Sequence, residues 1–128
     1  KVPLYGDGKN VRDWLYVEDN CQAIGLCMEK GKAGETYNIG GGNEVQNLKL
    51  AKIILKELGQ KEGMIEFVKD RLGHDWRYAL DFSKIKKLGY KPSADFARKM
   101  KETVSWYQKN EKWWKPLVEK AKIEKKAN

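Results

Sequence analysis

The sequence predicts an α/β fold in which short strands alternate with helices. Five short stretches rich in apolar or β-branched residues are typical of strands: residues 2–5, 14–17, 35–39, 65–68 and 78–80. Longer stretches lie between them, in which apolar residues recur every three or four positions as on the buried face of a helix. This alternating order belongs to the α/β class. At 128 residues the chain forms one domain or part of one.

The first strand ends at a turn over residues 6–8, where Asp-Gly supplies a local hydrogen bond and a positive φ. A second strand is expected over 14–17. Asp19 then caps a helix that ends near Gly31. Residues 35–39 alternate in polarity and predict a third strand, which three glycines close.

The clearest helical pattern ends at Gly59, a residue suited to stop a helix. Its apolar positions recur at helical spacing at Leu48, Ala51, Leu55 and Leu58. After the strands over 65–68 and 78–80, a short helix runs from Ser83 to Gly89. A last helix opens at Pro92 and Ser93. Its apolar face is predicted to consist of Phe96, Met100, Val104 and Tyr107.

The net charge of +8 is concentrated near the C-terminus. Residues 98–128 hold ten Lys or Arg against four Glu, whereas residues 1–97 hold sixteen basic against fourteen acidic residues. A Lys-rich stretch with interspersed Glu is typical of a solvated helix face. No nucleic-acid-binding motif accompanies it. No apolar stretch approaches the ~20 residues that a membrane span needs. The sequence therefore favours neither nucleic acid nor a membrane as a partner.

Cys21 and Cys27 lie six residues apart in a stretch predicted to be helical, so their thiols point to different faces and cannot easily form a disulfide. A single histidine and the absence of a Cys-x-x-Cys motif leave too few ligands for a zinc site. We expect reduced, buried cysteines, as in a cytosolic protein.

Gly40, Gly41 and Gly42 lie between a predicted strand and a predicted helix, where a phosphate-binding loop would be found. Their spacing is not Gly-x-Gly-x-x-Gly. Two interpretations stand: a tight turn, or a loop that brings the backbone close to a ligand to which Asn47 also donates. Asn47 is equally suited to cap the helix that follows.

Arg12 and Arg71 are candidates for anion binding. Arg12 lies among residues that favour burial, and a partly buried guanidinium needs an anionic partner. A neighbouring carboxylate could serve, and so could a ligand phosphate bound in a bidentate fork. Together with Asn47 and the single histidine, His74, the two arginines could surround a diphosphate. Tyr5, beside a turn, could stack on a planar base.

Several blocks of the sequence resemble, in the same order, the dTDP-glucose 4,6-dehydratase family of the extended short-chain dehydrogenase/reductase group. The blocks are residues 2–8 (VPLYGDG), 12–19 (RDWLYVED), 34–41 (GETYNIGG), 70–75 (DRLGHD), 78–81 (YALD) and 113–117 (WWKPL). The resemblance covers residues 1 to about 117. It implies that residues 1–117 are the C-terminal, sugar-nucleotide-binding segment of a Rossmann-type enzyme and that residues 118–128 are a basic tail.

The resemblance also implies a reaction and a cofactor. In that family an N-terminal Rossmann domain holds NAD, which oxidises the sugar at C4. Water leaves across C5–C6 and the hydride returns to C6, so the lyase converts dTDP-glucose to dTDP-4-keto-6-deoxyglucose. Tyr16 and Tyr37 are not followed by the lysine of the family's catalytic Tyr-x-x-x-Lys pair. The sequence also begins at Lys1 on a strand-like stretch. We therefore expect a preceding part that holds NAD and the catalytic residues, and an isolated chain that is inactive.

By the same resemblance, several residues bind the substrate. Tyr5 packs on the thymine with Pro3 and Leu4 as its neighbours, while Arg12, Asn47 and Arg71 surround the diphosphate and ribose, and His74 lies in the same loop. The family usually has proline at position 72. Because proline stiffens a loop, Leu72 is expected to leave Arg71 more mobile without ligand.

The resemblance implies a cytoplasmic homodimer that acts in deoxysugar and rhamnose biosynthesis. Two alternatives remain. The chain could belong to another epimerase or dehydratase acting on a UDP, CDP or GDP sugar, or it could be a stand-alone, non-catalytic nucleotide-binding module.

Overall fold

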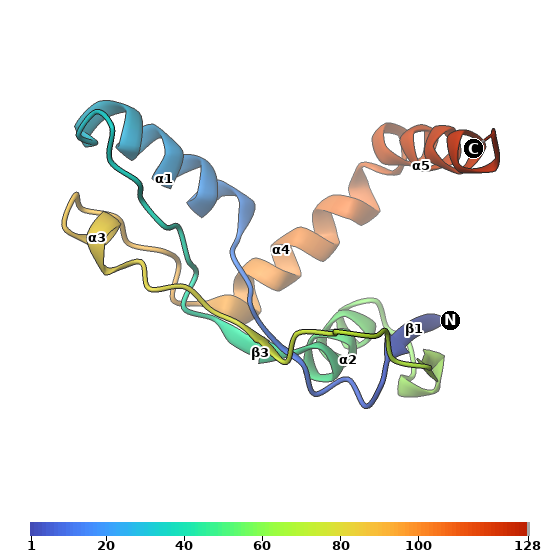
Figure 1. Ribbon diagram of the computed structural model, residues 1–128. Helices are drawn as coiled ribbons and strands as arrows, with labels where there is room; N and C mark the ends of the chain where they lie inside the picture. Colours follow the sequence, from blue (N-terminus) through green and yellow to red (C-terminus); the bar gives the residue numbers. More distant parts are fainter. Residues whose placement is uncertain (128) are drawn as a thin grey trace.

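The computed structural model describes the backbone of residues 1–127 and the side-chain environments of residues 1–121. Two small sheets and a set of helices form a mixed α/β structure (Figure 1). The strands are β1 (Val2–Tyr5), β2 (Val11–Asp13), β3 (Glu44–Gln46), β4 (Ile65–Val68) and β5 (Arg77–Tyr78). The helices are α1 (Val17–Lys30), α2 (Asn47–Glu57), the 3-10 turn η1 (Glu62–Met64), α3 (Ser83–Lys86), α4 (Phe96–Lys109) and α5 (Glu111–Ala127).

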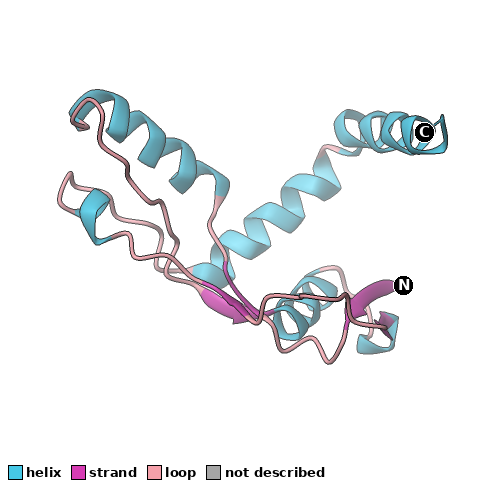
Figure 2. Ribbon diagram, in the orientation of Figure 1, coloured by secondary structure: helices cyan, strands magenta, loops and turns pink. Residues whose placement is uncertain are grey.

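The two sheets are built from strands far apart in the sequence. In the first sheet β1 pairs with β4 in parallel. In the second, β2 is the middle strand, antiparallel to β3 and parallel to β5. Helix α4 leads away from the second sheet, and α5 continues at its far end (Figures 1 and 2). The parallel pairings bring the carboxyl ends of paired strands to the same edge of each sheet.

The buried side chains form two groups. One joins α1 to α3 and consists of Ala23, Ile85 and Tyr90, with Ile85 and Ala23 fully buried. The other includes residues of β1, α2 and α4: Leu4, Leu50, Ala51, Leu55 and Val104. The accessible surface is 9714 Å². A compact monomer of 14.8 kDa exposes about 7,000 Å², so this chain is unusually open.

The sequence predicted the first sheet and helix α2 well. The strands over 2–5 and 65–68 are confirmed, and Gly6, in the turn after β1, has a φ of +56°. Helix α2 ends just before Gly59, which has a φ of +65° and donates to the carbonyl of Lys56 at 3.0 Å. A glycine is the residue that adopts this conformation without strain.

The predicted strand over 14–17 is wrong. The strand lies earlier, at Val11–Asp13, because those residues have partners on both sides in β3 and β5. Trp14 leaves this ladder while its backbone amide donates to the Asn43 carbonyl at 3.0 Å and its indole to the Val45 carbonyl at 3.1 Å. Helix α1 already begins at Val17.

Asp19 is not the helix cap that we predicted. It lies inside the first turn of α1 and is buried, with 6% of its surface exposed. Its carboxylate accepts hydrogen bonds from the backbone amide and the hydroxyl of Ser93, both at 2.9 Å. The carboxylate therefore fixes the chain before α4, rather than the start of α1.

Residues 35–39 form no strand in the described part of the chain, because no neighbouring strand pairs with them. The strand predicted over 78–80 is displaced to Arg77–Tyr78, where β2 provides the partner. The short helix from Ser83 is confirmed. The last helix begins at Phe96, later than predicted, because the side chain of Asp95 caps it by accepting from the Arg98 amide at 3.0 Å.

The basic C-terminal region contains a second helix, as its Lys-rich pattern with interspersed Glu indicated, although the sequence set no bounds for it. Helix α5 follows α4 after Asn110 and carries Pro116 in its interior. The expected boundary between residues 117 and 118 falls inside this helix, so no change of backbone structure marks it. The division into a substrate-binding segment and a tail stays a prediction.

None of the helices in the described residues is long and apolar enough to cross a membrane. The two cysteines are free, as predicted, but Cys21 is exposed and Cys27 is only partly buried. The expectation that both are buried is wrong, because Cys21 lies on the outward face of α1.

We expect Ile85→Ala to lower the free energy of unfolding by about 2–5 kcal/mol, because it leaves a cavity at a fully buried position. Urea titration followed by circular dichroism measures this change. Leu72→Ala is the control, because Leu72 is fully exposed. Equal unfolding midpoints for the two variants would show that the α1–α3 cluster does not stabilise the fold.

Candidate functional site

The candidate site begins where β1 and β4 end together. Tyr5 pairs with Val68 as the last residues of this parallel ladder. The loop after β4 then returns toward Tyr5, whose half-exposed ring meets the ring of His74 edge to face, with centroids 6.1 Å apart. Pro3 and Leu4 precede Tyr5 in β1; Pro3 is exposed and Leu4 is buried against Gly8. The structure thus brings Tyr5 and His74 together.

Asp70 organises the loop that carries Arg71 and His74. Its Oδ1 accepts from the Arg71 backbone amide at 2.9 Å and lies 2.6 Å from Nδ1 of His74. The His74 side chain is only 6% exposed. His74 therefore forms part of the wall of this loop. Leu72 points fully into solvent.

Arg12 projects from the middle strand of the second sheet. Its Nη1 donates to its neighbour's carbonyl, that of Val11, at 2.7 Å, and its Nη2 donates to the carbonyl of Asp75 at 3.0 Å. Within residues 1–121 no carboxylate forms an ion pair with it. Of the carboxylates that the sequence offered as partners, Asp13 and Asp19 bind other groups.

The guanidinium of Arg71 is exposed and makes no ion pair or hydrogen bond with the described residues. Its charge nevertheless reaches the same groups as that of Arg12. The hydrogen bond from the Tyr78 hydroxyl lowers the pKa of the Asp75 carboxyl, and the positive charges of Arg12 and Arg71 lower it further. The charges of both cations therefore act on the Asp75 carboxyl, although only Arg12 contacts that residue through its side chain.

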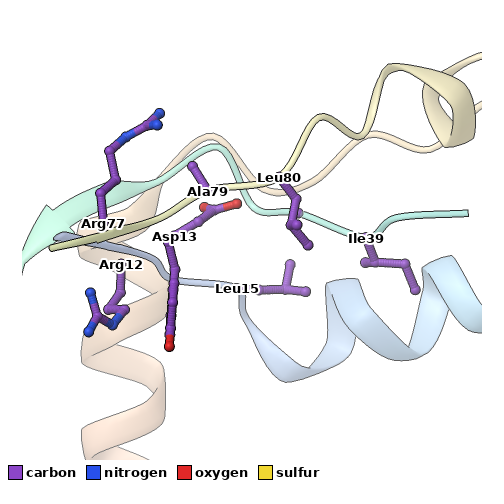
Figure 3. A pocket seen from close by; sticks show the side chains of 9 residues that line it. Arg12, Asp13, Leu15, Ile39, Arg77, Ala79 and Leu80 are labelled. Atoms are coloured by element: carbon purple, nitrogen blue, oxygen red, sulfur yellow. The ribbon is translucent and has the colours of Figure 1, made fainter. Parts of the chain in front are cut away.

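Arg77, which the sequence reasoning did not single out, serves a different purpose. Its guanidinium holds Glu44 in a bidentate ion pair, with Nε–Oε2 at 2.5 Å and Nη2–Oε1 at 2.8 Å. Neighbouring side chains of a strand point to opposite faces, and in Figure 3 Arg77 and Arg12 lie on opposite sides of the paired strands. The charge of Arg77 is thus neutralised, whereas that of Arg12 is not.

A cleft of about 360 Å³ opens beside Arg12 (Figure 3). Arg12 and Arg77 lie at its polar end, and apolar side chains line the end near α1. The lining residues are Arg12, Asp13, Leu15, Ile39, Gly40, Arg77, Tyr78, Ala79 and Leu80. Of the predicted site residues, only Arg12 lines this cleft; Tyr5, Arg71 and His74 lie in the other group, at the end of the first sheet.

The glycine loop is an irregular segment rather than the tight turn that we predicted, and two backbone amides at the loop are bound within the protein. The carboxylate of Asp13 accepts from the amides of Gly41 at 2.9 Å and Asn43 at 2.8 Å. The Gly40 carbonyl accepts from the hydroxyl of Tyr90 at 3.1 Å. A Cβ on Gly41 would lie 2.6 Å from the carbonyl oxygen of Trp14, the residue that follows β2. The loop therefore needs glycine at this position in order to pack closely.

Asn47 is the first residue of α2 and does not cap it with its side chain, contrary to one of the two interpretations above. Its backbone amide donates to the Asn10 carbonyl at 3.0 Å, and the next amide, of Leu48, donates to the Gly8 carbonyl at 2.9 Å. Asn10 also donates through its side chain to the carbonyl of Asp75 at 3.1 Å. Asn47 is therefore linked through Asn10 to the groups that hold Arg12.

Four residues hold the site together: Asn10, Asp13, Asp75 and Tyr78. Sequence reasoning did not single out Asn10 or Tyr78, and it considered Asp13 and Asp75 only as carboxylate partners for the arginines. Asp75 and Tyr78 lay within the blocks that carry the resemblance, but spacing gave no indication of what they contact. Asp13 follows Arg12 directly, and its alternation across the strand could have placed it on the face opposite Arg12.

The chain also contains one Tyr-x-x-x-Lys spacing that the sequence reasoning passed over, at Tyr5 and Lys9. A helix would place such residues on one face, but here they flank the turn after β1. The Lys9 ammonium pairs with Asp7 at 3.0 Å. The geometry does not present the two as a catalytic pair.

The described residues do not fit a dinucleotide cofactor or a metal ion. The amides of Gly41 and Asn43 are bound to Asp13, and the first two amides of α2 are bound to the carbonyls of Asn10 and Gly8, so these four are not free for a pyrophosphate. No group of three or more His, Cys, Asp or Glu side chains gathers closely enough to hold a metal ion within this part of the chain.

Comparison with known proteins now places the chain in a family. The model of the family described as GDP-mannose 4,6 dehydratase matches residues 1–103. The chain belongs to this family. A dTDP-glucose 4,6-dehydratase of Actinoplanes sp. is 53% identical over 114 residues, covering 88% of this chain and 36% of the relative. The chain thus spans about a third of the length of such a relative.

Solved structures of the same enzyme share the fold. The dTDP-glucose 4,6-dehydratase of Bacillus anthracis, in complex with NAD, aligns with a TM-score of 0.83 and 51% identity, covering 91% of this chain and 37% of that one. DesIV, a dTDP-glucose 4,6-dehydratase from Streptomyces venezuelae with NAD and TYD bound, aligns with a TM-score of 0.84 and 49% identity, covering 90% and 36%. These relatives support the predicted α/β, extended short-chain dehydrogenase/reductase fold.

Tyr90 should make the stability of the fold depend on alkaline pH. Burial, together with the charges of Asp19 and Asp13, raises the pKa of Tyr90 to about 12 from a usual value near 10. The unfolded chain therefore loses this proton first. Stability changes little below pH 9 and falls by about 2 kcal/mol as the pH rises from 10 to 12.

Urea unfolding at pH 8, 10 and 11.5 measures this decline, with Tyr90→Phe as the comparison. The Phe variant loses the hydrogen bond to Gly40 at every pH but lacks the titrating hydroxyl, so its stability should fall less steeply above pH 10. Parallel pH profiles for the two proteins would refute the prediction.

Proposed function

We propose that this chain is the dTDP-sugar-binding segment of an NAD-dependent dTDP-glucose 4,6-dehydratase, a lyase that forms dTDP-4-keto-6-deoxyglucose. The observation that carries the proposal is the pair of cations at the site. Arg12 and Arg71 both lower the pKa of the Asp75 carboxyl by their charge, Arg12 also donates to the carbonyl of that residue, and neither arginine forms an ion pair within the described residues. Guanidinium groups placed in this way suit the phosphates of a nucleoside diphosphate.

Neighbouring groups suit the rest of such a ligand. The half-exposed ring of Tyr5 offers an aromatic face for a base, and the His74 ring supports it from the side. Pro3, Leu4 and Asn47 complete the proposed set, with Leu4 and Asn47 acting through the backbone that they fix. The names of the relatives support dTDP as the nucleotide.

We place the chain at the C-terminal end of the parent enzyme. Its residues contain no Gly-x-x-Gly-x-x-Gly pattern, and Asp13 already binds the amides of Gly41 and Asn43 at its glycine loop. In this proposal NAD and the catalytic residues belong to another part of the enzyme, and the isolated chain is inactive. The parent is a cytoplasmic homodimer of deoxysugar and rhamnose biosynthesis, with neither nucleic acid nor a membrane as a partner.

Arg12→Ala and Arg71→Ala should each weaken the binding of dTDP by about 1.5–3 kcal/mol, roughly 10- to 150-fold, because each removes one charge-assisted contact to phosphate. Calorimetric titration of the protein expressed from its complete gene gives these affinities. Arg98→Ala is the matched control, since Arg98 lies in α4 and is already paired with Glu102. Unchanged affinity in both site variants would exclude the assigned pocket.

The main alternative is an enzyme for a different nucleotide sugar. The family model that matches the chain is named for a GDP sugar, and this name is the observation that favours the alternative. Titrations with dTDP, UDP and GDP separate the candidates: our proposal expects dTDP to bind most tightly. A stand-alone binding module would lack an in-frame dinucleotide-binding sequence upstream, which the complete gene sequence reveals.

A further inference from the structure

Tyr78 lies directly beside Arg12 in the second sheet. The two residues are partners in the parallel ladder between β2 and β5, so their side chains leave the sheet on the same face. The guanidinium carbon of Arg12 lies 4.2 Å from the centre of the Tyr78 ring. This distance allows a cation–π contact, which restricts the guanidinium to the plane above the ring.

The hydroxyl of Tyr78 binds a second partner of Arg12, the residue Asp75. It donates to Oδ2 of Asp75, and the backbone carbonyl of Asp75 accepts from Nη2 of Arg12 at 3.0 Å. Asn10 donates to that carbonyl as well, at 3.1 Å. Arg12 and Asn10 thus share the backbone carbonyl of Asp75, while the Tyr78 hydroxyl holds the side chain of the same residue.

The electrostatics of this pair agree with the geometry. The hydrogen bond to Asp75 raises the pKa of the Tyr78 hydroxyl, and the same bond lowers the pKa of the Asp75 carboxyl. At neutral pH the phenol thus remains a donor and the carboxylate an acceptor.

The two arginines of the site differ in how firmly their guanidinium groups are held. Arg12 is held by a ring, by two carbonyl oxygens and by the strand that carries it. Arg71 is exposed on a loop, and its guanidinium has no partner among the described residues. A fixed cation loses little conformational freedom when an anion binds, whereas a free one must be ordered.

We infer that Tyr78 is a positioning residue that orients Arg12 for the phosphates of the nucleotide. This inference rests on the proposed function. Tyr78 acts through its ring on the guanidinium and through its hydroxyl on Asp75, and Arg12 makes the contact with the anion. Arg12 is then the fixed contact of the site and Arg71 the adaptable one.

The test compares the binding of dTDP and of thymidine to the protein from the complete gene. Tyr78→Phe keeps the ring and loses the hydroxyl, so dTDP should bind about threefold more weakly; Tyr78→Leu loses both contacts and should bind about tenfold more weakly. Thymidine has no phosphate, so its affinity should stay unchanged in both variants. A merely structural defect would weaken both ligands.

Tyr107→Phe is the matched control, because Tyr107 and Tyr78 are each 52% exposed and the Tyr107 hydroxyl has no partner among the described residues. It should bind dTDP as the unmodified protein does.

A double-variant cycle with Arg12→Ala decides whether Tyr78 acts through Arg12. Without Arg12, Tyr78→Leu should have no further effect on dTDP affinity. Additive losses, or equal losses for dTDP and thymidine, would overturn the inference. If Arg12→Ala alone leaves the affinity for dTDP unchanged, it is the proposed function that fails.

Discussion

Strand β2 is only three residues long, and the candidate site depends on its position between β3 and β5. Each of its three residues makes a different contact. The backbone amide of Val11 donates to the carbonyl of Trp76, in the loop before β5, at 2.8 Å. Arg12 points to the side of Tyr78, and Asp13 binds the amides of the glycine loop. Because neighbouring strand residues face opposite sides, one short segment holds the loop on one face and presents a cation on the other.

The distribution of the carboxylates explains why some arginines are neutralised and others are not. Buried or partly buried carboxylates need donors, and several find them in backbone amides rather than in guanidinium groups. Asp13 binds the glycine loop and Asp19 binds Ser93. Glu44 is taken by Arg77. Arg12 and Arg71 are left without a carboxylate partner among the described residues, and Asp75, on whose carboxyl both charges act, is itself bound to a tyrosine hydroxyl.

The glycine loop shows how a sequence pattern and a function can separate. Glycines between a strand-like stretch and a helix are typical of phosphate loops, where free amides converge on the ligand. Here those amides converge on the Asp13 carboxylate, which occupies the position that a phosphate would take. The glycines are required because the loop packs directly on the backbone after β2. The anion-binding capacity of the site lies in side chains instead.

The amino-acid sequence by itself determined the α/β class, the strands β1 and β4, helix α2 with its glycine stop, and the family resemblance that named Arg12, Arg71 and His74. These features depend on residues close together in the chain or on ordered blocks, so local patterns reveal them. The strand at 14–17 and the strand at 35–39 failed because a strand exists only where another strand pairs with it, and local composition does not reveal the partner.

Only the tertiary structure decided which groups meet. Asp75 and Tyr78 lie more than sixty residues from Arg12 along the chain, and the parallel pairing of β2 with β5 brings them into contact. The position of Asp19 in the sequence predicted a helix cap, but in the fold its carboxylate accepts from the backbone amide and the hydroxyl of Ser93. Contacts between distant segments follow from strand pairing and burial, which the order of residues does not state. For that reason the sequence supplied the cations of the site, and the fold decided which of them is held in place.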